Sequence, residues 1–86
     1  MPGVSRKGMD SAGGTIVGGS SDVFVNGAGV VRIGDAIAGH GDPPHAGPVM
    51  AAGLGSVLVN GIPICRAGDA ASCGHAASGS GDVIAG

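Results

Sequence analysis

The chain has 86 residues, of which 20 are glycine and only one, Phe24, is aromatic. This length allows one small domain with a marginal core, so we expect the fold to need a metal, a partner or both. The net charge is −2 without a basic run, which argues against nucleic acid as a partner. No apolar stretch reaches the roughly 20 residues of a membrane helix, and a signal-peptide layout is missing.

The first element in chain order is a turn at Arg6–Asp10, whose pattern is Arg-x-Gly-x-Asp. The pattern returns as Arg-x-Gly-Asp at Arg32–Asp35 and Arg66–Asp69, so all three arginines of the chain hold one repeat position. We expect an Arg–Asp pair to close each turn, because a carboxylate can accept two parallel bonds from a guanidinium. Surface arginines that recur by chance are the alternative.

Residues 13–20 form a short β-prone run that ends in Gly-Ser. Similar segments lead into the second copy, at 47–56, and into the C-terminal tail, at 77–80. That tail, residues 81–84, resembles the start of the first copy, whereas the N-terminus begins in the middle of one. The two ends together would therefore make a third repeat.

Two β-hairpins are predicted, at Val23–Val31 and Val57–Ile64, within copies that lie 34 positions apart. Each has Asn-Gly, at 26–27 and 60–61, between short runs of mainly β-branched residues, which is the strongest short hairpin signal. Pro63 has no N–H to donate, so its strand should lie at an edge or a bulge. No window shows helical periodicity with caps, and the predicted fold is all-β.

All histidines lie in the two loops that follow the second and third Arg–Asp turns, residues 38–48 and 71–76. A single loop histidine is usually solvated, but three histidines and a cysteine confined to two paired loops favour a tetrahedral metal site. Four protein ligands would fill the shell, which predicts a structural ion. Asp42 is a candidate to orient a ligand histidine, although a solvated carboxylate is the simpler interpretation. The predicted ligands are His40, His45, Cys73 and His75.

The repeat also indicates different roles for the two cysteines. Cys65 aligns with Val31 and Ser5, and at such a position a free cysteine behaves as a small buried hydrophobe. Cys73 lies in a loop beside His75 and has no such explanation. A Cys65–Cys73 disulfide is the competing interpretation.

These features closely resemble the PAAR-repeat proteins, named for Pro-Ala-Ala-Arg. The matching segments are Pro63–Arg66 and Ala28–Arg32, with the Val-x-Val-Asn-Gly hairpins and the Cys-Gly-His loop, although the first copy lacks the proline and Met9 is extra. The resemblance covers essentially the whole chain and implies a single PAAR domain over residues 1–86 without an effector extension. It also implies a small cone of short β-hairpins with pseudo-threefold symmetry. A metal near its tip would be held by three histidines and one cysteine, by position His40, His45, Cys73 and His75.

The resemblance further implies a structural protein that caps and sharpens a trimeric β-helical spike in a type VI secretion system or a contractile phage tail. Its partner would be a VgrG-like or phage central spike bound through the base of the cone, with transient membrane contact on piercing and a toxin effector as a further partner. The expected location is the virion tail tip, or the cytoplasm during assembly followed by injection. The ion would be zinc rather than iron, because a thiolate favours zinc. The alternatives are a small metal-dependent hydrolase and an adaptor that recruits a separate toxin.

Overall fold

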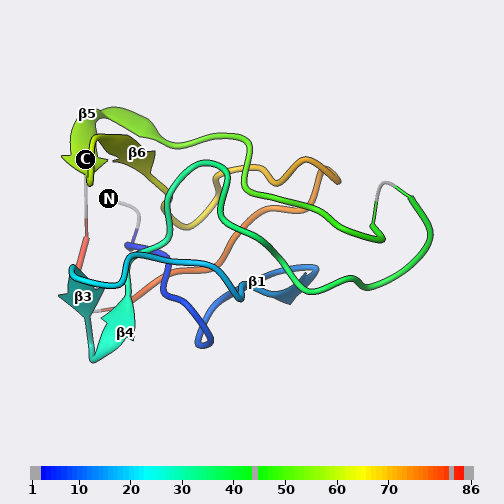
Figure 1. Ribbon diagram of the computed structural model, residues 1–86, viewed down its shortest axis with the longest axis horizontal. Coiled ribbons are helices and arrows are strands. Elements are labelled where there is room, and N and C mark those ends of the chain that lie inside the picture. Colours follow the sequence, from blue (N-terminus) through cyan, green and yellow to red (C-terminus); the bar gives the residue numbers. More distant parts are fainter. Residues whose placement is uncertain (1–2, 44, 82, 85–86) are drawn as a thin grey trace.

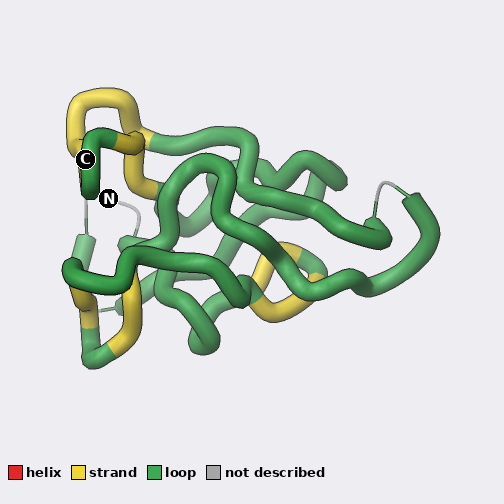
Figure 2. The backbone as a smooth tube through the Cα atoms, in the orientation of Figure 1, coloured by secondary structure: helices red, strands yellow, loops and turns green. Residues whose placement is uncertain are grey.

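The computed structural model describes residues 3–43, 45–81 and 83–84. Within these residues all regular structure is β, arranged as three antiparallel two-stranded sheets (Figures 1 and 2). The described part of the chain forms no helix, and so none that could cross a membrane. The all-β prediction is confirmed. The strands are β1 (Ser11–Ala12), β2 (Gly14–Thr15), β3 (Phe24–Val25), β4 (Ala28–Gly29), β5 (Leu54–Val59) and β6 (Ile62–Ile64), paired β1–β2, β3–β4 and β5–β6.

Both predicted Asn-Gly turns are present, one between β3 and β4 and the other between β5 and β6. Asn26 and Gly27 have φ angles of 52° and 78°, and Asn60 and Gly61 have φ angles of 56° and 78°. Positive φ at both central residues defines a type I′ turn, whose twist matches that of the flanking strands. The hairpin prediction is therefore confirmed at its turns.

The strand limits are less regular than the sequence predicts. The second strand of the first hairpin is β4, just before the predicted Val30–Val31, because Val30 pairs in an isolated bridge with Arg6 of the N-terminal copy. Pro63 pairs with Leu58 beside a register shift in β5. A residue without an N–H is tolerated at such an irregularity, as predicted.

The third copy is assembled from the two ends of the described chain. Gly3 pairs with Ile84 in an antiparallel bridge. The N–H of Val4 donates to the carbonyl of Val83 at 2.9 Å, and the N–H of Ser80 donates to the carbonyl of Val4 at 2.8 Å. The first hairpin makes the same two bonds at its equivalent positions. The prediction that the two ends complete one repeat is confirmed.

An Arg–Asp pair closes a turn in each copy. The guanidinium Nε lies 2.7 Å from the carboxylate in Arg6–Asp10, 3.1 Å in Arg32–Asp35 and 3.4 Å in Arg66–Asp69. In all three turns the same carboxylate also accepts the backbone N–H of its arginine. This recurring geometry confirms the predicted pairs and is not expected of surface arginines that recur by chance.

Equivalent residues from the three copies meet in the core. Ser5, Val31 and Cys65 share one repeat position, and each is 0% exposed. Val31 and Cys65 belong to a buried cluster in which small and medium side chains, rather than aromatic rings, fill the space between the copies. The other members of this cluster are Ala12, Ile16, Ile37, Met50, Ala71 and Ala77.

The molecule has one long axis and two nearly equal short ones, with extents of 32 × 23 × 22 Å. The hairpins β3–β4 and β5–β6 lie at its broad end, which also carries the Gly3–Ile84 bridge and which we call the base (Figure 1). The opposite end is narrower and carries the loop 38–48, and we call it the tip (Figure 1). The repeat thus builds a tapering domain whose two ends differ in chemistry.

Candidate metal centre

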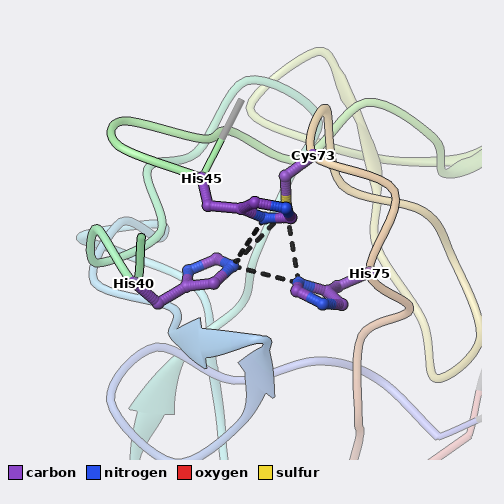
Figure 3. Close-up of side chains that lie close together, drawn as sticks. All are labelled: His40, His45, Cys73 and His75. Atoms are coloured by element: carbon purple, nitrogen blue, oxygen red, sulfur yellow. Dashed lines mark hydrogen bonds between the residues drawn. The ribbon is translucent and has the colours of Figure 1, made fainter. Parts of the chain in front are cut away.

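Two loops bring three histidines and a cysteine together at the tip. His40 and His45 come from the loop after the Arg32–Asp35 turn, and Cys73 and His75 come from the loop after the third turn. One ligand atom from each of these side chains lies within 4.8 Å of all the others. Figure 3 shows the four side chains converging from different directions.

Backbone hydrogen bonds fold each loop back on itself. In the first loop the N–H of His40 donates to the carbonyl of His45 at 2.8 Å, and the N–H of His45 donates to the carbonyl of Asp42 at 2.7 Å. In the second loop the N–H of Ala71 donates to the carbonyl of His75 at 2.8 Å. Each loop can therefore present two side chains to one point although most of its residues are exposed.

The partners of His40 fix which of its nitrogens faces the cluster. Its Nδ1 lies 3.1 Å from the carbonyl oxygen of Ala38, and because a carbonyl only accepts, Nδ1 carries the proton. Its Nε2 then keeps a lone pair, and it lies 3.0 Å from Nδ1 of His75 and 3.2 Å from Nδ1 of His45. A backbone carbonyl in this position orients an imidazole for metal binding.

Four of the six separations between the ligand atoms are close to those around a tetrahedral ion. With a Zn–N distance of about 2.0 Å and a Zn–S distance of about 2.3 Å, tetrahedral ligands lie about 3.3 Å apart for two nitrogens and about 3.5 Å apart for nitrogen and sulfur. Two of the three nitrogen pairs lie 3.0 and 3.2 Å apart, and Cys73 Sγ lies 3.7 Å from His40 Nε2 and 3.6 Å from His75 Nδ1. The two remaining pairs, which involve His45, lie within 4.8 Å. These four residues could therefore hold one metal ion.

Cys65 is separated from this cluster, as the repeat predicts. Both cysteines are free, so the alternative of a Cys65–Cys73 disulfide is wrong. Burial, with the negative charges of Asp69 and Asp35, raises the pKa of the Cys65 thiol to about 12. Its S–H donates to the carbonyl of Ala52 at 3.3 Å. Cys65 thus stays a neutral thiol in the core, whereas metal binding needs a thiolate.

The group that orients His40 is the backbone carbonyl of Ala38 and not Asp42, the candidate suggested by the sequence. Asp42 is exposed, and its carboxylate makes no hydrogen bond to a histidine among the described residues. The sequence gives no signal for the carbonyl, because every residue has one. The simpler interpretation of Asp42 as a solvated carboxylate agrees with its exposure.

A comparison with known families identifies the type of domain. The family model of the PAAR motif matches residues 6–74, most of the chain. The chain belongs to the PAAR motif family. No curated protein matches it. In this PAAR domain His40, His45 and Cys73 lie within the matched region, and His75 follows its last residue. Membership supports a structural, spike-tip-associated role in contractile injection systems.

The base of the PAAR domain exposes apolar side chains at equivalent positions of the three copies. Phe24 is 58% exposed, Leu58 is 56% exposed and Ile84 is 51% exposed. The residue before each of them is a valine that is also exposed. The two ends of the domain therefore differ, with an apolar base and a tip whose histidines and cysteine could hold a metal ion.

Proposed function

We propose that the protein is the structural tip of a contractile injection machine, a type VI secretion system or a phage tail, where it caps and sharpens a trimeric β-helical spike. The observation that carries this proposal is the repeated apolar base, with Phe24, Leu58 and Ile84 exposed at one position of three copies. Exposed apolar patches of this kind mark interaction surfaces.

The symmetry of the base favours a trimeric partner. Three equivalent subunits present three equivalent surfaces around one axis, and a single chain matches them only if it carries three similar contacts. In the base hairpins, β4 and β6 accept backbone hydrogen bonds from neighbouring copies, at Gly29 and Pro63. The outer edges of β3 and β5 are therefore the ones that a partner could cover. The blunt end of a trimeric spike meets both requirements.

The role proposed for the metal is mechanical. The ion, zinc in preference to iron because one ligand is a thiolate, would tie together loops from two copies at the tip. Four protein ligands leave no open position for a catalytic water, which supports a structural ion and no enzymatic turnover. Held in this way, the tip would keep its shape when the spike is driven through an envelope. The protein would then be carried on a virion tail, or assembled in the cytoplasm and injected.

Binding to the spike trimer of the same machine tests the proposal. Phe24→Asp and Leu58→Asp place a charge on the base and should each weaken binding at least about tenfold, because the contact would bury that charge. Val17→Asp is the matched control, since Val17 is 48% exposed but lies outside the base hairpins. The wild-type protein should bind one chain per trimer in mass photometry. No binding by the wild type, or equal loss with the control, would reject the base as the docking surface.

A further inference from the structure

Gly13 lies directly against the ligand nitrogens at the tip. It is the single residue between the paired Ala12 and Gly14 of the β1–β2 turn, and its φ angle is 85°. A Cβ atom at this position would lie 2.0 Å from His75 Nδ1 and 2.6 Å from His40 Nε2. Because a carbon–carbon bond is about 1.5 Å long, the Gly13 Cα must lie within roughly 3.5 Å of the His75 nitrogen. Figure 3 shows this turn, in blue, beneath the two histidines.

The β1–β2 turn is the N-terminal counterpart of the two ligand loops. After each Arg–Asp turn a strand pair or bridge closes an excursion of the chain, and the three excursions are residues 12–14, 37–48 and 71–75. The two longer excursions carry the histidines and Cys73, while the shortest carries one alanine and two glycines. All three copies therefore meet at the tip, although only two supply ligand side chains.

We propose that Gly13 is a positioning residue of the metal centre, where the N-terminal copy supplies a backbone floor and the absent side chain leaves room for the ligands. The inference deepens the proposed function, because it rests on a metal at this site. Both separations of the added Cβ are shorter than non-bonded atoms allow, so a methyl group at position 13 would displace at least one of the two histidines.

The next residue protects the orientation of His40 in the same way. A Cβ atom on Gly14 would lie 2.4 Å from the carbonyl oxygen of Ala38 and 2.9 Å from His40 Nδ1. These two atoms form the contact that leaves His40 Nε2 facing the cluster. Gly13 thus makes room for the ligand atoms, and Gly14 makes room for the hydrogen bond that orients one of them.

Gly13→Ala and Gly34→Ala form a matched pair that tests the floor. Gly34 has a φ angle of 92° and no heavy atom within 4 Å of its added Cβ, so both variants carry similar left-handed strain but only Gly13→Ala meets the ligands. Metal-free protein is titrated with Co²⁺, whose visible absorption reports tetrahedral thiolate coordination, and then with Zn²⁺ in competition. Gly13→Ala should bind at least about tenfold more weakly with an altered Co²⁺ spectrum, while Gly34→Ala should match the wild type within about twofold.

A Gly13→Ala variant with the metal affinity and Co²⁺ spectrum of the wild type would overturn the proposal that Gly13 positions the ligands. If Gly13→Ala folds poorly, urea midpoints with and without His75→Ala decide the question. The decrease in urea midpoint caused by Gly13→Ala should be smaller once the His75 ring is removed. An equal decrease with and without His75→Ala would count against the proposal. A wild-type protein that takes up no metal would overturn the proposed metal centre too, so the two failures are distinguishable.

Discussion

Cys65 and Cys73 are chemically identical side chains that the fold gives opposite roles. Cys65 is 0% exposed and belongs to the core cluster, where burial holds its pKa near 12. Cys73 is partly buried and lies within 3.7 Å of a nitrogen of His40 and of His75. Surroundings, rather than residue type, therefore decide which sulfur is offered to a metal.

Replacing the cysteines one at a time should separate these roles. Cys73→Ser should remove the bound metal from purified protein, because the thiolate is lost and only three histidine ligands remain. Cys65→Ala should keep one metal per chain and lower the unfolding free energy by about 1 kcal/mol through lost packing. Elemental analysis and urea denaturation measure both effects. Metal that is retained by Cys73→Ser but lost by Cys65→Ala would reverse the ligand assignment.

Asp10 shows how a buried carboxylate is kept ionised by its partners. Burial acts to raise its pKa, but hydrogen bonds from Arg6 and Ser78 outweigh burial and hold the pKa below the usual value of about 3.8. Ser78 Oγ donates to the carboxylate at 2.8 Å. Because the pKa is lower in the folded than in the unfolded protein, Asp10 stabilises the fold above the unfolded pKa, and this contribution is lost as the pH falls below about 4.

Asp10→Asn should therefore destabilise the protein by about 1–3 kcal/mol at neutral pH, since a charged hydrogen-bond acceptor is lost. The difference from the wild type should shrink as the pH falls below about 4, because the wild-type carboxylate becomes protonated first in the unfolded chain and then, at lower pH, in the folded protein. Urea midpoints at several pH values provide the measurement, with the exposed Asp42→Asn as control. A difference that stays constant with pH would show that the charge of Asp10 contributes nothing.

At the scale of elements, each hairpin turn is determined by its own residues. Asn-Gly allows positive φ at two successive residues whatever surrounds it, so the turns at 26–27 and 60–61 could be predicted from a few neighbouring residues. The strand limits could not, because Val30 pairs with Arg6 of another copy. Local signals fixed the turns, and contacts between copies decided where each strand ends.

Part of the candidate site could also be predicted from the sequence, and part could not. His40, His45, Cys73 and His75 could be recognised because they interrupt an otherwise regular repeat and have ligand side chains. Gly13 could not, because its role depends on a side chain that it lacks and on histidines distant in the sequence. The only sequence signal is that residues 12–14 follow an Arg–Asp turn as the two ligand loops do.

The turn residue Asn60 joins its hairpin to the first copy. Its side-chain oxygen accepts from Arg32 Nη1 at 3.1 Å and from Ser20 Oγ at 2.8 Å. Its Nδ2 donates to Asp22 at 3.3 Å. Asn26 accepts from Arg6 Nη1 at 3.1 Å in the equivalent place. These contacts make the asparagines links between copies as well as turn residues.

Two substitutions of Asn60 separate the contribution of its side-chain hydrogen bonds from that of its turn geometry. Asn60→Gly keeps the positive φ but removes the side-chain hydrogen bonds, and should cost about 1 kcal/mol of unfolding free energy. Asn60→Ala removes the bonds and adds backbone strain, and should cost about 1 kcal/mol more than Asn60→Gly. Guanidinium denaturation of both variants and the wild type gives the comparison. Equal stability of the alanine and glycine variants would mean that the turn geometry does not restrict this position.

At the scale of the whole molecule, the proposed metal would link loops from two copies at the tip. The described core consists mainly of small and β-branched side chains with no aromatic ring. Such a core gives a small domain little stability of its own. A metal that binds only the folded chain adds its binding free energy to folding.

Removing the metal should therefore lower the melting temperature by at least about 10 °C. A ligand at a hundred times its Kd contributes about 2.7 kcal/mol, and each kcal/mol corresponds to roughly 4–8 °C in a domain of this size. Calorimetry with and without a chelator measures the shift, and re-addition of Zn²⁺ should restore it. Chelator should leave the melting temperature of Cys73→Ser unchanged. An equally unresponsive wild type would exclude a stabilising ion.

The copy shared between the two ends has a consequence for how the chain folds. Gly3 pairs with Ile84, so the third copy is complete only when nearly the whole described chain has been brought round into a closed ring. An open array of repeats can fold one unit after another, each stabilised by its neighbour. Here closing the largest loop is needed to complete the last unit, and non-local contacts of this kind slow folding. The ring should consequently form late and in a single cooperative step, without a stable species of two copies.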